Sequence, residues 1–233
     1  MSPLLQTHQL KAWYGDAQAL FGIDFQIEPG EVVAIIGANG AGKSTFLKAL
    51  TGMVKVAPDA VRFQGKPCGG LPSGQLTKLG IAMVPEGRRL FPSLSVEENL
   101  KMGAFSGRRG PWNLDRVYAL FPILKEKRAL PGTQLSGGQQ QMVALGRALM
   151  SNPELLLCDE LSLGLAPVVI KDIYDAMDPI IEDGMSVVIV EQDVTMAQKV
   201  SDRVYCFQEG TVALQGKSDE VTREQIHEAY FGS

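Results

Sequence analysis

A glycine-rich segment that ends in lysine, serine and threonine is the part of this chain best equipped for chemistry. Residues 36–45 read IGANGAGKST and contain the pattern G-x-x-x-x-G-K-[ST], which predicts a loop that wraps phosphate groups. Glycines let the backbone approach phosphate oxygens, and N–H groups at the start of a following helix attract negative charge. Lys43 is expected to reach the β- and γ-phosphates, and the Ser44 hydroxyl is expected to bind Mg²⁺. The predicted phosphate-binding residues are Gly37, Asn39, Gly40, Ala41, Gly42, Lys43, Ser44 and Thr45.

The segments that flank this loop have the character it requires. Residues 32–36 form an apolar run rich in β-branched side chains, which is typical of a buried strand. Residues 43–50 read as a helix, and Gly52 is a residue type at which helices commonly end. The order strand, loop, helix disfavours the alternative of a glycine-rich turn with a chance lysine.

Two adjacent acids follow another apolar strand, at residues 155–158. A parallel strand here would carry Asp159 to the carboxyl edge of the sheet, beside the phosphate loop, where it could hold Mg²⁺ through water. Glu160 is then expected to polarise a water molecule directed at the γ-phosphorus. The alternative is a pair of surface acids at a strand end, which the upstream phosphate loop disfavours.

A second anion-binding pattern lies at residues 135–139, which read LSGGQ. Ser136 and Gln139 have the spacing of a capping box, so a helix is expected to begin here. Ser136, Gly137 and Gly138 would offer backbone N–H groups and the positive end of a helix dipole to a phosphate. The alternative is a capping box with no ligand.

These segments together resemble the ABC ATPases over nearly the whole chain. Residues 37–45 resemble the Walker A motif, 155–160 the Walker B motif, 135–139 the signature motif and 162–165 the segment that crosses the dimer interface. The resemblance implies a head-to-tail dimer, in which the signature of one subunit closes over ATP bound to the P-loop of the other. The signature residues implied to act in this way are Ser136, Gly137, Gly138 and Gln139.

The resemblance also assigns roles to single residues. Tyr14 matches the aromatic residue that stacks on the base, although an aromatic packed at a strand end is the alternative. Gln192 stands where most members have the switch histidine, and it is implied to be catalytic together with Glu160 and Lys43. Glu86 stands where most members have the coupling-loop glutamine, and it is expected to be a weaker ligand of Mg²⁺ than Ser44 and Asp159.

Finer features resemble one of the two ATP-binding subunits of bacterial branched-chain amino-acid importers. They are Glu86, Gln192, residues 162–167 and the ending EAYFG at 228–232. Urea-importer subunits tend to keep the coupling-loop glutamine. Leu161 stands where the family usually has proline, and this departure could slow hydrolysis. Residues 57–60 replace the usual Ser-Gly turn, and we expect only a local loop difference there.

The implied protein is an ATPase that powers uptake of branched-chain or related amino acids. Its implied partners are a second copy or a related ATPase subunit, integral-membrane permease subunits and, indirectly, a periplasmic or extracellular solute-binding protein. It is expected at the cytoplasmic face of the inner membrane as a peripheral protein. The alternatives are an importer ATPase for urea or amides and a soluble, non-transport ABC ATPase. A non-transport ABC ATPase would need a long coiled-coil insertion or two cassettes in one chain, and the sequence has neither. A GTPase is a further alternative, but the Asn-Lys-x-Asp motif that it would need is absent.

Composition agrees with these expectations. The chain has 233 residues, a net charge of −4 and a pI of about 5.3, which argues against a nucleic-acid partner. No apolar run approaches the roughly 18 residues of a membrane span, and the first residues lack the features of a secretion signal. The 3 scattered cysteines suggest reduced thiols in a cytosolic protein, and the 2 histidines make histidine-based catalysis improbable.

Alternating strands and helices predict an α/β fold of the P-loop NTPase (RecA-like) type, with a mostly parallel sheet. Period-two alternation at 20–28 predicts a half-buried antiparallel strand, so we expect an N-terminal antiparallel β subdomain. A single ABC ATPase domain is expected over 1–233, with an α/β core at about 1–90 and 151–233 and an inserted helical subdomain at about 91–150. Strands are expected at 61–64, 81–84, 187–190, 204–207 and 212–214, helices from Ser95, at 114–124, 139–150 and 167–183 and from Thr222, and loops at 67–74 and 103–112.

Overall fold

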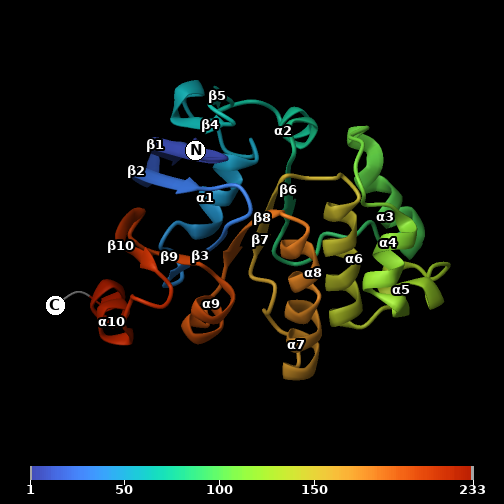
Figure 1. The fold of residues 1–233 in the computed structure, drawn as a ribbon. Helices are drawn as coiled ribbons and strands as arrows, with labels where there is room; N and C mark the ends of the chain where they lie inside the picture. The colour runs from blue at the N-terminus through green and yellow to red at the C-terminus, as the bar shows by residue number, and fades with distance from the viewer. Residues whose placement is uncertain (1, 232–233) are drawn as a thin grey trace. The chain divides into compact units, whose positions relative to one another are not determined.

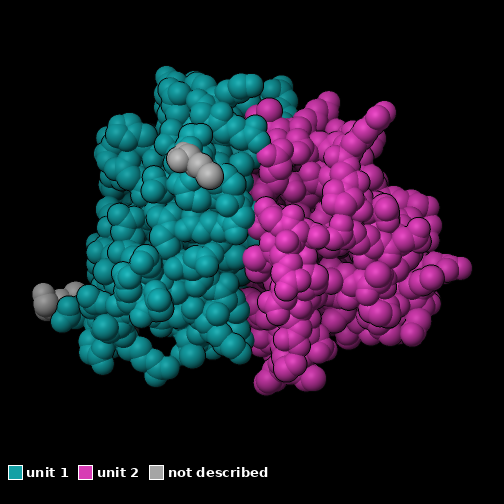
Figure 2. Space-filling view, viewed as in Figure 1, with its two compact units in different colours: residues 1–76, 186–233 teal, residues 77–185 magenta. Residues whose placement is uncertain are grey.

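The computed structural model describes residues 2–231, and they form two compact units (Figure 2). Unit 1 consists of Met1–Leu76 and Ser186–Ser233, and unit 2 consists of Thr77–Met185. The division expected from sequence, with a helical subdomain at about 91–150, stays a prediction. Gly232, the last residue of the C-terminal resemblance, lies outside the described residues.

An antiparallel sheet in unit 1 has the strand order β2-β1-β4-β5. Its strands are β1 (Leu5–Tyr14), β2 (Ala17–Ile27), β4 (Val61–Phe63) and β5 (Lys66–Pro67). In β2 the side chains of Ile23, Phe25 and Ile27 are buried and those between them are not, which confirms the predicted half-buried antiparallel strand. Phe21 departs from the alternation and is 51% exposed, because the chain shifts out of register at Gly22, whose φ is 108°.

Strand β1 was not predicted, because a bulge hides its alternation. Gln9 has a φ of 45°, and the pairing of β1 with β2 shifts register between Thr7 and Leu10. The bulge is held by Asp24, whose carboxylate accepts the Gln9 backbone N–H at 2.7 Å and its side-chain amide at 2.6 Å. The extra residue moves later side chains to the opposite face, so period two fails along the strand.

The other strands of unit 1 pair in the order β10-β9-β3-β8. Strand β3 (Val32–Gly37) is parallel to β8 (Ser186–Val190) on one side and to β9 (Arg203–Gln208) on the other, and β10 (Thr211–Lys217) is antiparallel to β9. Every residue of β3 and β8 is buried, as expected for parallel strands covered on both faces. The helices of this unit include α1 (Lys43–Leu50), α9 (Val194–Val200) and α10 (Arg223–Phe231) (Figure 1).

Aromatic side chains join α1 to the strands of unit 1. The Phe46 ring on α1 lies 5.1 Å from the Phe25 ring of β2 and 5.3 Å from the Phe207 ring of β9, in edge-on contacts. The Phe25 ring also lies 4.7 Å from that of Tyr205. These contacts place the helix that follows the glycine-rich loop on a rigid apolar base.

Unit 2 combines two parallel strands with a set of helices (Figure 1). The strands are β6 (Ile81–Val84) and β7 (Leu155–Asp159), with Val84 opposite Cys158. The helices are α3 (Val96–Gly103), α4 (Leu114–Leu120), α5 (Pro122–Glu126), α6 (Gly137–Leu149), α7 (Pro167–Asp175) and α8 (Met177–Glu182). A Cβ at Gly146 on α6 would approach Leu100 of α3 to 2.8 Å, so glycine permits close helix packing there.

Two predicted helices are wrong in their extent because proline interrupts them. The helix expected at 114–124 is divided into α4 and α5 before Pro122, and the one expected at 167–183 is divided into α7 and α8 at Ala176. Proline lacks the N–H that a continuous helix needs and restricts the residue before it. Pro179 therefore cannot donate to the carbonyl of Asp175, and the helix restarts at Met177.

The loops expected between elements are more structured than predicted. The segment at 67–74 contains the start of helix α2 (Ser73–Leu79), and short 3₁₀ turns occur at η1 (Pro58–Ala60), η2 (Ala104–Ser106) and η3 (Gly132–Gln134). Within 103–112, the Arg108 guanidinium pairs with the Glu154 carboxylate at 2.7 Å and Trp112 is buried. The remaining strands are present where the sequence predicts them.

Capping residues were predicted more reliably than helix lengths. Ser95 and Glu98 form a capping box at the start of α3, with the Ser95 side chain accepting from the Glu98 N–H at 3.2 Å. Thr222 caps α10 by accepting from the Gln225 N–H at 3.2 Å. The fold class is confirmed: an antiparallel sheet, mostly parallel strands and flanking helices. None of the described helices has both the length and the apolar character that a membrane span requires.

Candidate nucleotide site

The glycine-rich loop lies between the end of β3 and the start of α1 in unit 1. Gly37 closes β3 opposite Phe207, and a Cβ at this position would lie 2.4 Å from the Phe207 carbonyl oxygen. Gly40 and Gly42 have φ values of 85° and 100°, in the left-handed region that favours glycine. Gly37 has a φ of 151°, and a Cβ at Gly42 would approach Leu20 to 2.8 Å, so both ends of the loop combine a positive φ with too little room for a Cβ.

Helix α1 begins without a side-chain cap. Its N-cap is Gly42, no side chain accepts a hydrogen bond there, and no acidic residue lies in the first turn. The backbone N–H groups and the positive end of the helix dipole thus form an anion-binding end. This arrangement is what binding of nucleotide phosphates requires.

Lys43 is the first residue of α1, and its side chain folds back over the loop. The side chain is 5% exposed, and Nζ donates to the Gly37 carbonyl at 2.6 Å and to the Ala38 carbonyl at 3.0 Å. Burial raises the pKa of the nearby Cys206 thiol to about 11 against the opposing effect of the Lys43 charge. Cys206 is therefore a neutral thiol.

Tyr14 is the last residue of β1 and leaves its ring accessible. Its side chain is 49% exposed, beside a β-turn that pairs it with Ala17. A half-exposed ring offers a face on which a base can stack. Trp13, 46% exposed, is a second accessible aromatic at the same end of the strand.

Gln192 follows β8 and leaves the sheet at the same edge as the glycine-rich loop. Val190 of β8 lies opposite Ile35 of β3, and the two strands are parallel. Gln192 is exposed, whereas the N-cap of α9 is Asp193, whose carboxylate accepts the Met196 N–H at 3.0 Å. Capping of α9 therefore does not require the Gln192 side chain.

The two acids of unit 2 differ in their surroundings. Asp159, the last residue of β7, is 2% exposed, and Glu160 directly after it is partly buried. Glu160 has a φ of 51°, a left-handed conformation that a residue with a side chain seldom adopts. Such strained backbone is found preferentially at functional sites. Leu161, where a proline was expected, is buried in the protein.

The LSGGQ segment begins helix α6 in unit 2 with a complete capping box. The Ser136 side chain accepts the Gln139 N–H at 3.3 Å, and the Gln139 side chain accepts the Ser136 N–H at 3.1 Å. A Cβ at Gly138 would lie 2.2 Å from the Val169 side chain of α7. A Cβ at Gly137 would lie 3.1 Å from the Arg88 guanidinium, so a cation lies beside this helix start.

The loop that follows β6 carries Glu86 and is tied to α6. Gly87, Arg88 and Arg89 have successive positive φ values of 72°, 65° and 47°. The Arg147 guanidinium on α6 donates to the carbonyls of Arg88 at 3.0 Å and Arg89 at 2.8 Å. Burial lowers the pKa of Arg147. Sequence reasoning missed Arg147, because nothing in its local spacing shows which carbonyls it will reach.

The residue types expected at the Mg²⁺ are oxygen donors, namely the Ser44 hydroxyl and the carboxylates of Asp159 and Glu86. Mg²⁺ prefers oxygen ligands and keeps several waters, so it needs only one or two protein groups beside the phosphates of a nucleotide. In the described part of the chain, no group of three or more His, Cys, Asp or Glu side chains could hold a metal alone. The donor chemistry fits a Mg²⁺ that arrives with a nucleotide.

Known proteins resemble this chain along its whole length. The profile of the ABC transporter family matches residues 20–162. The high-affinity branched-chain amino acid transport ATP-binding protein BraG of Pseudomonas aeruginosa is 42% identical, over 98% of this chain and 100% of that protein. A "Probable branched-chain amino acid transport ATP-binding protein LivF" of Archaeoglobus fulgidus is 35% identical, over 97% of each chain.

Solved structures resemble it in fold at lower sequence identity. An ATP-binding cassette of an ABC transporter superposes with a TM-score of 0.84 at 27% identity, covering 100% of both chains. A dimeric cassette in a post-hydrolysis state, bound to ADP and phosphate, has a TM-score of 0.81 at 27% identity, covering 92% of this chain and 98% of that one.

Proposed function

The chain belongs to the ABC transporter family as an ATP-binding, ATP-hydrolysing subunit, and we propose that its transporter imports branched-chain or related amino acids. The observation that carries this proposal is the full-length likeness to BraG, whose name assigns it to branched-chain amino acid transport. Glu86 and Gln192, which stand in place of the usual glutamine and histidine, support the same assignment.

In unit 1 we assign nucleotide binding to the loop between β3 and α1. Gly37 to Thr45 wrap the phosphates with backbone N–H groups, and Lys43 exchanges its two backbone carbonyls for the β- and γ-phosphates of ATP. The ring of Tyr14 stacks on the base. Gln192 donates a hydrogen bond to the γ-phosphate from its amide, which unlike histidine takes up no proton near neutral pH.

In unit 2 we assign the hydrolytic step to Glu160. Its carboxylate accepts a proton from water while the water oxygen attacks the γ-phosphorus, and the bond from that phosphorus to the bridging oxygen of ADP breaks. Ser44, Asp159 and, more weakly, Glu86 are the residues that would hold Mg²⁺. Bound there, Mg²⁺ would neutralise charge on the β- and γ-phosphates.

The signature segment acts in trans under this proposal. Ser136, Gly137, Gly138 and Gln139 of one subunit contact the ATP on the P-loop of a second copy or a related ATPase subunit. ATP binding closes the dimer, and hydrolysis reopens it. This motion drives integral-membrane permease subunits, served by a periplasmic or extracellular solute-binding protein. The chain then works peripherally at the cytoplasmic face of the inner membrane, without nucleic acid.

The test is reconstitution with the native membrane subunits. The full chain is purified with the permease subunits that it binds, and ATPase rate is measured with binding proteins loaded with leucine, isoleucine, valine, glutamine or urea. Branched-chain solutes are expected to stimulate hydrolysis and the others are not. Stimulation by urea or an amide alone would replace the proposed substrate, and failure of the chain to bind any permease subunit would favour a non-transport cassette.

A matched variant separates transport from ATP consumption in this assay. Glu160→Gln keeps the size of the side chain and removes its basicity, so uptake and stimulated hydrolysis are both expected to stop. Solute uptake that continues in this variant would show that another ATPase subunit supplies the energy.

A further inference from the structure

The C-terminal helix contacts the first residue of the glycine-rich loop. The Tyr230 hydroxyl on α10 accepts the backbone N–H of Gly37 at 2.8 Å, although the two residues are 193 positions apart in the chain. Both belong to unit 1, where α10 lies beside β9 and β10 (Figure 1). This bond connects α10 to the start of the glycine-rich loop.

Gly37 is held on both sides of its peptide backbone. Its N–H donates to Tyr230, while its carbonyl accepts from Lys43 Nζ at 2.6 Å. The position leaves no room for a side chain, because a Cβ here would lie 2.4 Å from the Phe207 carbonyl oxygen and 3.2 Å from Ala41. Before ATP replaces them, the carbonyls of Gly37 and Ala38 together place the lysine ammonium, and Tyr230 is one of the groups that set the orientation of Gly37.

The hydroxyl is itself held in place by an apolar cluster. Tyr230 packs against a group of buried side chains that includes Ile36 of β3, Cys206 of β9 and Ile226 of α10. Burial raises the pKa of Tyr230, so its phenol stays neutral at physiological pH. A neutral hydroxyl retains the lone pairs that an acceptor of a backbone N–H needs.

We propose that Tyr230 is a positioning residue for the nucleotide loop, which orients Gly37 and thereby Lys43 for ATP without touching the nucleotide. The inference rests on the proposed role of residues 37–45 in binding ATP phosphates. It adds a role for the C-terminal helix that neither the P-loop pattern nor the fold class contains. The hydroxyl accepts the Gly37 N–H, and the ring, packed in the apolar cluster, holds the hydroxyl in position.

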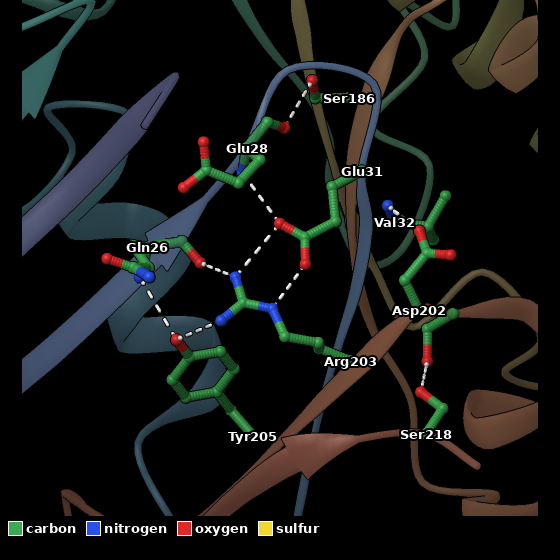
Figure 3. A network of polar contacts seen from close by, with 10 residues as sticks. Gln26, Glu28, Glu31, Val32, Ser186, Asp202, Arg203, Tyr205 and Ser218 are labelled. Carbon is green, nitrogen blue, oxygen red and sulfur yellow. Dashed lines mark hydrogen bonds and ion pairs between the residues drawn. The ribbon is translucent and has the colours of Figure 1, made fainter. Parts of the chain in front are cut away.

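The chain offers a matched control for the loss of such a hydroxyl. Tyr205 on β9 is buried, whereas Tyr230 is partly buried, and the Tyr205 hydroxyl accepts hydrogen bonds from the Gln26 backbone N–H at 3.3 Å and from the Arg203 guanidinium at 3.5 Å (Figure 3). The Arg203 guanidinium lies beside it and pairs with Glu31 (Figure 3). Tyr205→Phe therefore removes the same atom and the same kind of bond as Tyr230→Phe, but at the Gln26 backbone of β2 in place of the phosphate loop.

The experiment compares the two variants in the full chain with a fluorescent ATP analogue, mant-ATP, and Mg²⁺. Tyr230→Phe is expected to raise the Kd roughly tenfold, since a backbone N–H loses its acceptor where ligand binding needs it ordered. Tyr205→Phe is expected to leave the Kd within about twofold of wild type while lowering the unfolding temperature comparably. Equal Kd values for Tyr230→Phe and wild type would overturn the proposal.

Amide hydrogen exchange gives a second readout, without nucleotide. Exchange at the Gly37 N–H is expected to accelerate in Tyr230→Phe but not in Tyr205→Phe. Exchange at the Gln26 N–H is expected to accelerate in Tyr205→Phe but not in Tyr230→Phe. An unchanged Gly37 amide in Tyr230→Phe would also overturn the positioning role. Lys43→Ala tests the proposed function separately. If this variant still binds mant-ATP, residues 37–45 are not the ATP loop. Hydrogen exchange at the Gly37 N–H in Tyr230→Phe would still decide whether Tyr230 positions Gly37.

Discussion

Glycines lie at the starts of both α1 and α6, but the two N-termini are built differently. Helix α1 begins after Gly42 with no side-chain cap, whereas α6 begins at Ser136 with a complete capping box. In α6 the Gln139 N–H already donates to the Ser136 hydroxyl, and the Gln139 side-chain oxygen accepts the Ser136 N–H. The first helix is thus an open anion site, and the second is closed by its own side chains.

The glycines at the two helix starts also serve different purposes. Gly40 and Gly42 have positive φ values, so they shape the loop before α1. Gly137 and Gly138 belong to α6 and leave room for neighbours, which are the Arg88 guanidinium and the Val169 side chain. The comparison supports our proposal that the P-loop binds phosphate by itself. A phosphate at the signature would have to compete with the capping bond of Ser136, which fits a segment that engages ATP only when a second subunit presents it.

Glu160→Gln should have the largest effect. It should trap the dimer in which the start of α1 in one subunit and the start of α6 in the other contact the same ATP. Turnover is expected to fall by about 10²–10⁴-fold, because the amide cannot accept the proton of the attacking water. ATP binding should persist, and the variant should accumulate as an ATP-bound dimer. Single-turnover hydrolysis and size-exclusion chromatography with ATP measure both effects. Turnover at the wild-type rate would remove Glu160 from the mechanism.

Gly137→Asp tests whether the signature helix acts only in the dimer. A carboxylate at the start of α6 would repel phosphate, so hydrolysis should fall by roughly 10²-fold or more, as for loss of a transition-state contact. Titration of the monomer with mant-ATP should give an affinity close to that of wild type, because α1 alone binds there. A loss of monomer affinity equal to that of Lys43→Ala would place the signature on the ATP of its own subunit.

Gln192 lies at the same sheet edge as the open helix start of α1 and should matter for hydrolysis more than for affinity. Gln192→Ala should lower the single-turnover rate by roughly 10²-fold with little change in ATP Kd. Gln192→His should recover part of the rate and add a pH dependence near 6.5, the ordinary pKa of imidazole. The wild-type rate should show no titration from this position between about pH 6 and 8. Full activity in Gln192→Ala would exclude the switch role.

Alanine substitutions compare the two kinds of glycine directly. Gly42→Ala should lower the free energy of unfolding by about 1–3 kcal/mol, because φ at this position is 100° and a Cβ would approach Leu20 to 2.8 Å. Gly137→Ala should change it by less than about 0.5 kcal/mol, since the position is helical and its nearest neighbour is the end of a flexible arginine. Urea unfolding of both variants measures the difference, and equal losses would refute the distinction.

Ser136→Ala should have only a modest effect on the fold. Loss of the N-cap of α6 should lower stability by about 1 kcal/mol, whereas α1 has no side-chain cap to lose. Urea unfolding again provides the measurement, with Ser95→Ala at the start of α3 as a control because it removes an equivalent capping box. A loss of hydrolysis much larger than that of the control would show that the Ser136 hydroxyl also contacts the nucleotide.

The elements that were predicted well depend on neighbours in sequence. The bounds of α1 and the caps at Ser95, Ser136 and Thr222 follow from side chains within three or four positions. Elements that depend on a distant partner were missed. The bulge of β1 at Gln9 is held by Asp24, and its register shift hid the alternation that would have predicted the strand.

The sequence by itself determined the local elements to which we assign the chemistry: a glycine-rich loop, an acid pair after a strand and a capped helix, each encoded in consecutive residues. The tertiary structure alone decided how these segments are held. It supplied the Tyr230 bond to Gly37, the Arg147 bonds to the loop after β6 and the positive φ of Glu160. The physical reason is the separation in sequence between interacting groups. The backbone groups of a helix cap or a P-loop find their partners among neighbouring residues. A backbone group that must be met by a residue 193 positions away is satisfied only once the strands and helices have packed.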